Sequence, residues 1–479
     1  MLTQELLELV NTIQRQKAEG QTLEIKAAHQ GCPQRLYDTL SSFANQDMGG
    51  TIVFGIDEKQ DFAPVGVYDL QALQKSVTEQ CNQMEPAVRA VFTNAEIDGI
   101  SVCSAEIPGT DISERPCYYK GKGRTKGSYI RVGDADLPMT DYELYSFEAF
   151  RRHLHDDERP VERASLTTLD NTQLQNYILQ KKLERPGFAQ LTDEQAMEML
   201  NITRNGIPTL ASVMNFCIYP QGYFPQFAIT AVVVPGTEIG EHMGSSSRFL
   251  DNKRIEGTIK NMVEEALLFC KRNMKIQTII DPDTGVRKDR AEYPLEAIRE
   301  AILNALIHRD YSHYTEGTPI QLNFFTDRLE IHSPGTLYGR MTVEQLGHAR
   351  PDLRNPALAV MTEILVGAEN RYSGIPTIRR EMAAHNLPEP VFENRRNEFV
   401  VTLYNQPSAV KKTNAPSETT LLAFCRQPRS RNEIAKFLGL KTASYAMDRY
   451  IKPLLETGAL ELTIPERPRS TRQKYKSKL

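Results

Sequence analysis

Apolar positions recur along this chain at two spacings, which together predict a mixture of helices and strands. Helical spacing at the start predicts an amphipathic helix that buries Leu2, Leu6, Leu7, Val10 and Ile13. Short apolar runs at 23–27 and 51–56 predict strands, with a helix over 33–45 between them. Gly49-Gly50 permits a tight turn before the second run, so the first segment predicts an α/β unit.

The same patterns divide the chain into modules. Apolar runs at 90–93, 100–107 and 128–132 predict further strands, and the polar stretch after residue 155 predicts a linker. A second linker is rich in Pro, Ser, Asn and Lys, and after it three helical segments precede a basic hairpin wing. The predicted modules are 1–155, a connecting α/β region 156–289, 290–405, the linker 406–417 and a tail 418–479.

The composition is that of an ordinary globular protein. Of 479 residues, 40% are hydrophobic and 25% are charged, which excludes collagenous, coiled-coil and wholly disordered chains. No stretch reaches the ~18 to 20 apolar residues of a membrane helix. The first ten residues hold two Glu and no Lys or Arg, unlike a targeting peptide, so we expect a cytoplasmic protein without a membrane partner. Seven scattered Cys without a CxxC pair argue against disulfides and a cysteine zinc site.

Charge is distributed unevenly along the chain. Residues 411–479 hold 15 Lys and Arg against 6 Asp and Glu, a net charge of +9. Because the whole chain carries -4, the first 410 residues carry -13. A basic tail on an acidic body favours a separate module that contacts polyanions.

The first cluster with candidate chemistry is Glu19, Glu24, Lys26 and Asp57. Glu24 and Lys26 are two residues apart and share one face of a strand, while Asp57 follows the neighbouring strand. Converging carboxylates bind a divalent cation that activates water at a phosphodiester, and a lysine neutralises the developing charge. The alternative is a solvated ion pair that orders the sheet.

In the segment 115–131, cations alternate with tyrosines and glycines. Cations bind phosphates and rings stack on unpaired bases, so we interpret the segment as a flexible nucleic-acid-binding hairpin. The alternative is a solvated hairpin with a basic tip. The predicted contacts are Arg115, Tyr118, Tyr119, Lys120, Lys122, Arg124, Lys126, Tyr129 and Arg131.

The tail supplies another set of cations. In a winged helix-turn-helix module, the recognition helix enters the major groove and the wing contacts phosphates. The predicted contacts are Lys441, Tyr445 and Arg449 on the helix, and Arg467 and Arg469 on the wing. The alternative is a winged module for protein contacts or dimerisation.

Glu300 and Asn304 lie one helical turn apart in REAILNAL and therefore share one helix face. A plain polar stripe on an amphipathic helix is the alternative to a ligand site. No GxxxxGK[ST] motif is present, so no P-loop motor is predicted.

Several sequence blocks resemble known families. Within 15–145, the blocks EGQTLEIK, SSFANQDMGGTIVFGIDE and RPCYYKGKGRTKGSYIRVGD resemble the AlbA-type domain shared with Schlafen proteins. Within 290–405, PLEAIREAILNALIHRDYS, LEIHSPGTL, ARPDLRNPALAV and SGIPTIRREMAAHNLPEPVFE are similar to the RecG-like carboxy-terminal domain, a divergent GHKL ATPase fold. With its tail, the chain resembles bacterial proteins described as predicted transcriptional regulators.

The resemblance implies an α+β and α/β multidomain fold: an AlbA-type domain, a divergent GHKL-like domain and a winged helix. It implies that Glu19, Glu24 and Asp57 hold Mg or Mn, with Lys26 beside them, in a Schlafen-like endoribonuclease acting on structured, tRNA-like RNA in phage defence or stress. The alternative is a DNA-binding transcriptional regulator without catalytic activity.

The resemblance also implies that Glu300 serves as a general base and Asn304 as a magnesium ligand, so that the pair binds ATP. The family's DxGxG block departs from the pattern here, because it appears as Ser333-Pro334-Gly335 and lacks the Asp. The expected partners are nucleic acid, RNA or DNA, and further copies of the chain in a homo-oligomer.

Overall fold

The computed structural model describes residues 1–240, 249–280, 287–367, 373–406, 424–437, 451, 454–455, 459–463 and 474–477. The chain forms two compact units, residues 1–405 and 406–479, which are described separately. No helix in these described ranges is long and apolar enough to cross a membrane. The predicted mixture of helices and strands in several domains is confirmed.

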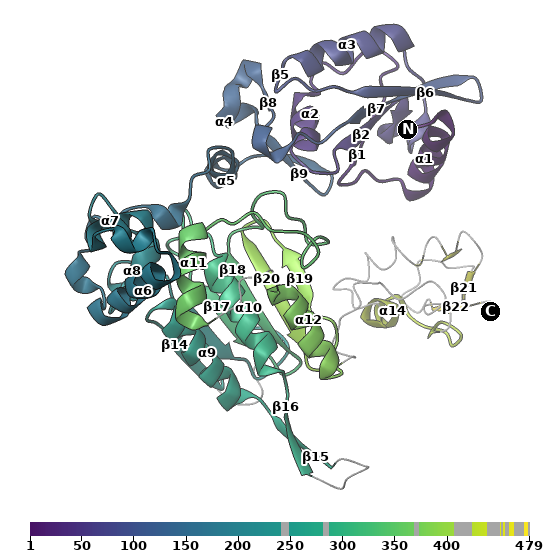
Figure 1. Cartoon of the computed structure of the whole chain (residues 1–479). Coiled ribbons are helices and arrows are strands. Elements are labelled where there is room, and N and C mark those ends of the chain that lie inside the picture. Colours follow the sequence, from purple (N-terminus) through teal and green to yellow (C-terminus); the bar gives the residue numbers. More distant parts are fainter. Residues whose placement is uncertain are drawn as a thin grey trace. The chain divides into compact units, whose positions relative to one another are not determined.

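The first unit begins with a four-stranded sheet in the order β1-β2-β7-β6. The strands are β1 (Leu23–Lys26), β2 (Gly50–Phe54), β6 (Val91–Ile97) and β7 (Ile100–Ile107). β1 and β2 are parallel, whereas the other neighbours are antiparallel. Three helices surround this sheet: α1 (Thr3–Gln16), α2 (Tyr37–Ala44) and α3 (Leu70–Asn82) (Figure 1).

Alternation along β2 directs its side chains into two separate cores. Ile52 and Phe54 join the core that contains α2 and α3. Val53 belongs to the other core, with the buried side of α1, which consists of Leu6, Val10 and Ile13. Because successive strand residues face opposite sides of a sheet, α1 covers one face and α2 and α3 cover the other.

Short elements follow this sheet. The antiparallel pairs are β3 (Ile56–Asp57) with β4 (Ala63–Pro64), β5 (Met84–Glu85) with β8 (Tyr118–Tyr119), and β9 (Tyr129–Val132) with β10 (Ala135–Pro138). They lead to helix α5 (Asp141–Arg151), which begins with a capping box between Thr140 and Glu143.

The hairpin predicted over 115–131 has an antiparallel bridge between Tyr118 and Ser128, but its tip is helical where a flexible loop was predicted. Between β8 and β9 the chain forms a 3-10 turn over Lys120–Lys122 and then the short helix α4 (Gly123–Gly127). The helical turn brings Gly127 against the β8 backbone, where an added Cβ would lie 2.6 Å from the Tyr119 carbonyl oxygen. Glycine at this position therefore permits a compact turn in place of an extended loop.

The rest of the first unit is built on a six-stranded sheet in the order β14-β13-β17-β18-β20-β19. The strands are β13 (Ile229–Val233), β14 (Asp251–Ile255), β17 (Ile320–Phe324), β18 (Arg328–Pro334), β19 (Val391–Asn394) and β20 (Glu398–Tyr404). β13 is parallel to β17, and the other pairs are antiparallel. Residues 229–255 thus complete the same sheet as residues 320–404.

Helices cover this second sheet and share one hydrophobic core with it. They are α9 (Ile259–Asn273), α10 (Leu295–Ile307), α11 (Pro356–Val366) and α12 (Gly374–Ala384), and Figure 1 shows α9, α10 and α12 lying across the strands. Further elements are α6 (Asn171–Glu184), α7 (Asp193–Met199), α8 (Leu210–Phe216), and the pairs β11 (Thr203–Arg204) with β12 (Ile207–Pro208) and β15 (Ile276–Ile280) with β16 (Arg287–Ala291).

The second unit contains α14 (Arg431–Phe437) and the antiparallel pair β21 (Leu460–Leu462) and β22 (Tyr475–Ser477). Its buried residues are Cys425, Ile434, Ile451, Leu454, Leu460 and Tyr475. The predicted DNA contacts Lys441, Tyr445, Arg449, Arg467 and Arg469 lie outside the described residues. The winged helix-turn-helix therefore stays a prediction.

Candidate functional site

The carboxylate cluster of the first sheet is built around a buried ion pair. The side chain of Glu24, on β1, is 8% exposed and contacts Arg131 Nη1 at 2.8 Å, as well as Lys26. Arg131 is 1% exposed, lies 3.0 Å from Asp136, and donates to backbone carbonyls of the β1 region. The Glu24 carboxylate is therefore compensated by ion pairs, although its Oε2 makes no hydrogen bond among the described residues, and removing Arg131 would leave a buried charge unpaired.

The other predicted metal ligands have different partners. Glu19 accepts a hydrogen bond from the Ile25 N–H at 2.7 Å, and its partial burial raises its pKa. Asp57 caps the 3-10 turn after β3, where it accepts from the Lys59 N–H at 2.9 Å and the Gln60 amide at 3.0 Å.

No three His, Cys, Asp or Glu side chains in the described part of the chain come together as ligands for a metal. Joint coordination by Glu19, Glu24 and Asp57 is therefore not seen among the described residues, and the Mg or Mn predicted there stays a prediction. The physical reason is that Glu24 neutralises Arg131, while Glu19 and Asp57 accept hydrogen bonds from separate stretches of backbone.

Three of the predicted nucleic-acid contacts are internal. Besides Arg131, the buried Arg115 pairs with Asp47 at 2.7 Å. Tyr129 is buried as well, and its hydroxyl accepts from Lys122 Nζ at 2.8 Å. These three predictions are corrected because Tyr129 and Arg131 share the buried face of β9, and Arg115 is buried where it follows the 3-10 turn at Ile112–Glu114.

Other members of segment 115–131 are partly covered. Tyr118 and Tyr119 are half-buried, and the Tyr119 ring stacks on Tyr37 with centroids 3.8 Å apart. Arg124 turns towards α5, where it pairs with Glu148. The Tyr119 face that contacts Tyr37 is thus closed to a stacking base.

Three lysines stay on the outside of this segment. Lys120, Lys122 and Lys126 are exposed on the 3-10 turn and α4, and we call them the lysine face. Lys120 and Lys122 lie 3.4 and 3.5 Å from Glu85 and Asp38. Exposed pairs of this kind contribute about 0–1 kcal/mol, so the ammonium groups can exchange them for phosphates.

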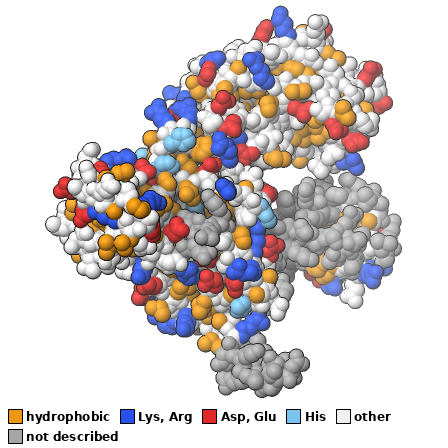
Figure 2. Space-filling view, in the orientation of Figure 1, with side chains coloured by type: hydrophobic (Ala, Val, Ile, Leu, Met, Phe, Trp, Pro, Cys, Tyr) orange, Lys and Arg blue, Asp and Glu red, His pale blue; other side chains and the backbone are white. Residues whose placement is uncertain are grey.

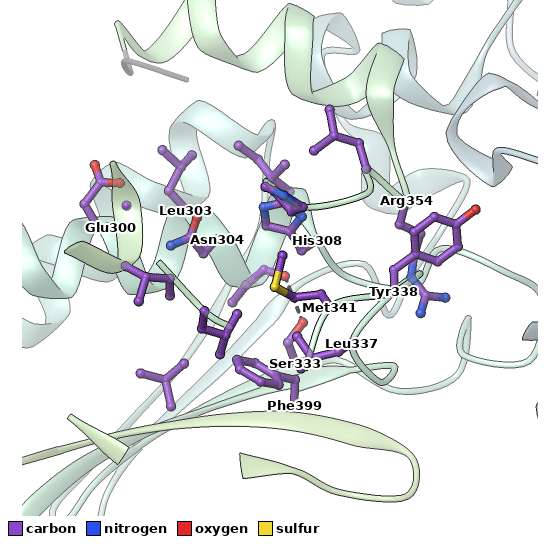
Figure 3. Close-up of a pocket in the computed structure, with 18 of the residues that line it drawn as sticks. Glu300, Leu303, Asn304, His308, Ser333, Leu337, Tyr338, Met341, Arg354 and Phe399 are labelled. Carbon is purple, nitrogen blue, oxygen red and sulfur yellow. Dashed lines mark hydrogen bonds between the residues drawn. The ribbon is translucent and has the colours of Figure 1, made fainter. Parts of the chain in front are cut away.

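A second candidate site is a pocket between α10, α12 and the segment after β18. Its volume of about 180 Å³ far exceeds the roughly 10–15 Å³ that one water needs. Figure 3 shows Glu300 and Asn304 on α10 at one end, and Tyr338 and Arg354 at the other. The walls between them are largely apolar, with Leu303, Leu337, Met341, Leu346, Ile375 and Ile378.

One buried polar atom at the α10 end of the pocket lacks a hydrogen-bond partner among the described residues. Asn304 Nδ2 is buried and has no hydrogen-bond partner among the described residues. Glu300 lies 3.2 Å from Arg299, and burial raises its pKa. A Cβ added at Gly374 would lie 2.9 Å from Asn304 Nδ2 and 3.2 Å from Glu300 Oε2, so glycine keeps this end open. An unpaired buried amide costs about 1–3 kcal/mol, which a ligand acceptor would recover.

The block 333–335 supplies no carboxylate to the pocket. The Ser333 hydroxyl donates to a backbone carbonyl of α10 at 2.9 Å. The nearby Asp310 is buried and accepts from Arg354 at 2.5 Å and Tyr142 at 2.9 Å. The pocket therefore holds an unpaired amide donor beside a carboxylate at its α10 end, and block 333–335 lacks the acid that the resemblance implies for reading adenine.

Several residues of the two sites were not predicted from the sequence. Tyr338 and Arg354 line the pocket from a loop without periodicity, and so no sequence pattern marks them. On α5, Glu148 pairs with Arg151 and Arg152, and the i,i+3 and i,i+4 spacings are signals that could have revealed this cluster.

Two known protein families match regions of the chain that contribute strands to the two sheets. Residues 19–140 match the family described as Schlafen, AlbA_2, and residues 317–403 match the family described as putative ATP-dependent DNA helicase recG C-terminal. Residues 419–477 match the C-terminal domain of Fic-like proteins, named for filamentation induced by cAMP. None of the curated proteins matches the chain.

Two solved structures are similar. One is the DIP2311 protein from Corynebacterium diphtheriae, at 20% identity and a TM-score of 0.40, covering 95% of this chain and 93% of that chain. The other is the N-terminal domain of a putative ATP-dependent DNA helicase RecG-related protein from Nitrosomonas europaea, at 25% identity and a TM-score of 0.23, covering 29% of this chain and 94% of that chain.

The families matched at the two sheets indicate a nucleic-acid-related function. The chain carries an amino-terminal domain of the Schlafen AlbA_2 family and a central domain of the RecG carboxy-terminal, HATPase-like family.

Proposed function

We propose that this protein binds the phosphate backbone of nucleic acid through the lysine face of its AlbA_2 domain, without cutting it. The observation that carries the proposal is a contrast within one domain. Lys120, Lys122 and Lys126 are exposed, whereas Glu24 is committed to the buried Arg131. Exposed ammonium groups bind phosphates by releasing counterions, and this binding requires no catalytic carboxylate.

Binding to labelled duplex DNA and to a labelled RNA stem-loop, followed by anisotropy over a range of salt, tests this proposal. Replacing all three lysines by Gln is expected to weaken binding and to reduce the salt slope by about 0.9 for each lost contact to B-DNA. The matched control replaces Lys59, Lys75 and Lys271 by Gln, because these exposed lysines lie elsewhere and the net charge changes equally. Equal losses in both triple variants would disprove a specific lysine face.

We further propose that the central pocket binds a magnesium nucleotide through Asn304 and Glu300. The unpaired Asn304 amide and the open space at Gly374 support this assignment. Asn304 Oδ1 and Glu300 would hold a magnesium ion, which would neutralise phosphate charge, and the unpaired Asn304 Nδ2 would donate to a phosphate oxygen. Binding is proposed without turnover, since Glu300 pairs with Arg299.

Titration calorimetry with MgATP tests the pocket. Gly374→Ala places a methyl group against Asn304 and is expected to weaken binding about tenfold, which corresponds to about 1.4 kcal/mol. Gly187→Ala is the matched control, because an added Cβ there has nothing within 4 Å. If MgATP binds both variants as it binds the original protein, the ligand does not occupy this pocket.

A further inference from the structure

Three arginines converge on one carboxylate beside the lysine face. Arg124 of α4 and Arg152, which directly follows the last residue of α5, both form ion pairs with Glu148, and Arg151 Nη2 lies 2.6 Å from it. We call Arg124, Arg151 and Arg152 the arginine cluster. It extends beyond the residues that match the AlbA_2 family, because α5 begins after residue 140.

The arginine cluster carries excess positive charge at the surface. Burial alone would raise the pKa of Glu148, but the Arg124 hydrogen bond and the neighbouring arginine charges lower it below its ordinary value. The carboxylate is therefore ionised, and three cations surround one anion. The arginine side chains are 32, 39 and 66% exposed for Arg124, Arg151 and Arg152, so donors remain open to solvent.

The arginine cluster lies next to the lysine face. Arg124 belongs to α4, the short helix that also carries Lys126, and because residues two apart on a helix point in different directions the two groups form neighbouring faces. Figure 2 shows Lys and Arg side chains gathered where α4 and α5 lie in Figure 1. α5 is held in place at its other end, since Glu143 accepts two hydrogen bonds from Arg396 and Tyr142 donates to Asp310.

We propose that the arginine cluster is a second phosphate-binding site for the same nucleic acid, and that Glu148 competes with the phosphate for Arg124. The inference rests on the proposed binding at the lysine face. Guanidinium groups match carboxylate and phosphate oxygens with the same geometry, so an internal carboxylate occupies donors that a backbone phosphate would use. Glu148 thereby limits the affinity of the surface.

The site is tested by removing its most exposed cation. Arg152→Gln is expected to weaken binding of duplex DNA and of the RNA stem-loop roughly fivefold, and to reduce the salt slope on duplex DNA by about 0.9. Arg380→Gln is a closely matched control, because Arg380 is also 66% exposed and also pairs with a glutamate of its own helix. If the two variants bind alike, the arginine cluster is not a phosphate site.

The competition is tested by neutralising the carboxylate. Glu148→Gln is expected to tighten binding about threefold at physiological salt, because it frees Arg124 and removes a negative charge beside the phosphate. Glu184→Gln on α6 changes the net charge equally, and it should leave the affinity unchanged. Weaker binding by Glu148→Gln, in a protein with an unchanged unfolding curve, would show that Glu148 organises the arginines and would overturn the competition.

The outcomes separate this inference from the proposed function. If the original protein binds neither probe, both fail. If the lysine-face variant weakens binding but Arg152→Gln does not, the proposed function stands and the arginine cluster is excluded. If both variants weaken binding, the interface includes α5.

Discussion

Polar groups are held away from bulk water both in the network around Glu24 and at the end of the pocket around Asn304. The two places differ in whether the protein itself supplies partners for these groups. Glu24 and Arg131 are almost fully buried and lie 2.8 Å apart. The Asn304 amide is buried without a partner among the described residues and faces a cavity. A buried ion pair is costly to break, because removal of one partner leaves the other charge uncompensated, whereas a buried donor without a partner is available to a ligand.

This difference predicts opposite consequences of substitution. Changes in the Glu24 network should reduce the free energy of unfolding, because they leave a charge uncompensated. Changes at Asn304 should reduce ligand binding at little cost to the fold. Functional positions often lower the free energy of unfolding of the protein without ligand, because their side chains are kept for binding.

The largest effect is expected from Arg131→Met. It leaves Glu24 and Asp136 without their buried partner, so the free energy of unfolding should fall by about 3–5 kcal/mol. Urea unfolding followed by circular dichroism measures this loss. Arg380→Met, at an exposed arginine, should change stability by less than about 0.5 kcal/mol. If the Arg131→Met protein is stable but does not bind nucleic acid, Arg131 contacts the nucleic acid and the correction above is wrong.

A smaller effect of opposite sign is expected from Asn304→Leu. Replacing an unpaired buried amide by an apolar side chain should raise the free energy of unfolding by about 1 kcal/mol while abolishing MgATP binding. Thermal unfolding and calorimetry on the same sample measure both quantities. Lower stability with unchanged binding would mean that the amide serves the fold.

The smallest effect is expected from Asp57→Ala. Asp57 caps a single 3-10 turn, so its loss should cost about 0.5–1 kcal/mol. Binding to duplex DNA and to the RNA stem-loop should be unchanged, because Asp57 lies on β3 and not on the lysine face. Loss of a metal-dependent activity in this variant would show instead that Asp57 is a ligand.

Periodicity predicted most of the first sheet, because strands such as β2 and β7 carry apolar runs whose length and alternation suffice. It also placed Glu300 and Asn304 on one face of α10, where the structure finds them at the pocket. Spacing along one segment could not show that Arg131 would meet Glu24, more than a hundred residues earlier, or that Arg124 would turn to Glu148. Such partners are set by tertiary packing, which decides which cations remain at the surface.

Whether the AlbA_2 domain binds RNA without cutting it is decided by comparing the original protein with Glu24→Gln on a labelled RNA stem-loop, with Mg, Mn or EDTA. Binding and cleavage are followed together, and unfolding is measured on the same samples. We expect salt-sensitive binding without cleavage, equal affinity in both proteins, and lower stability for Glu24→Gln because Arg131 loses its partner. Metal-dependent cleavage by the original protein that disappears in Glu24→Gln would contradict this expectation.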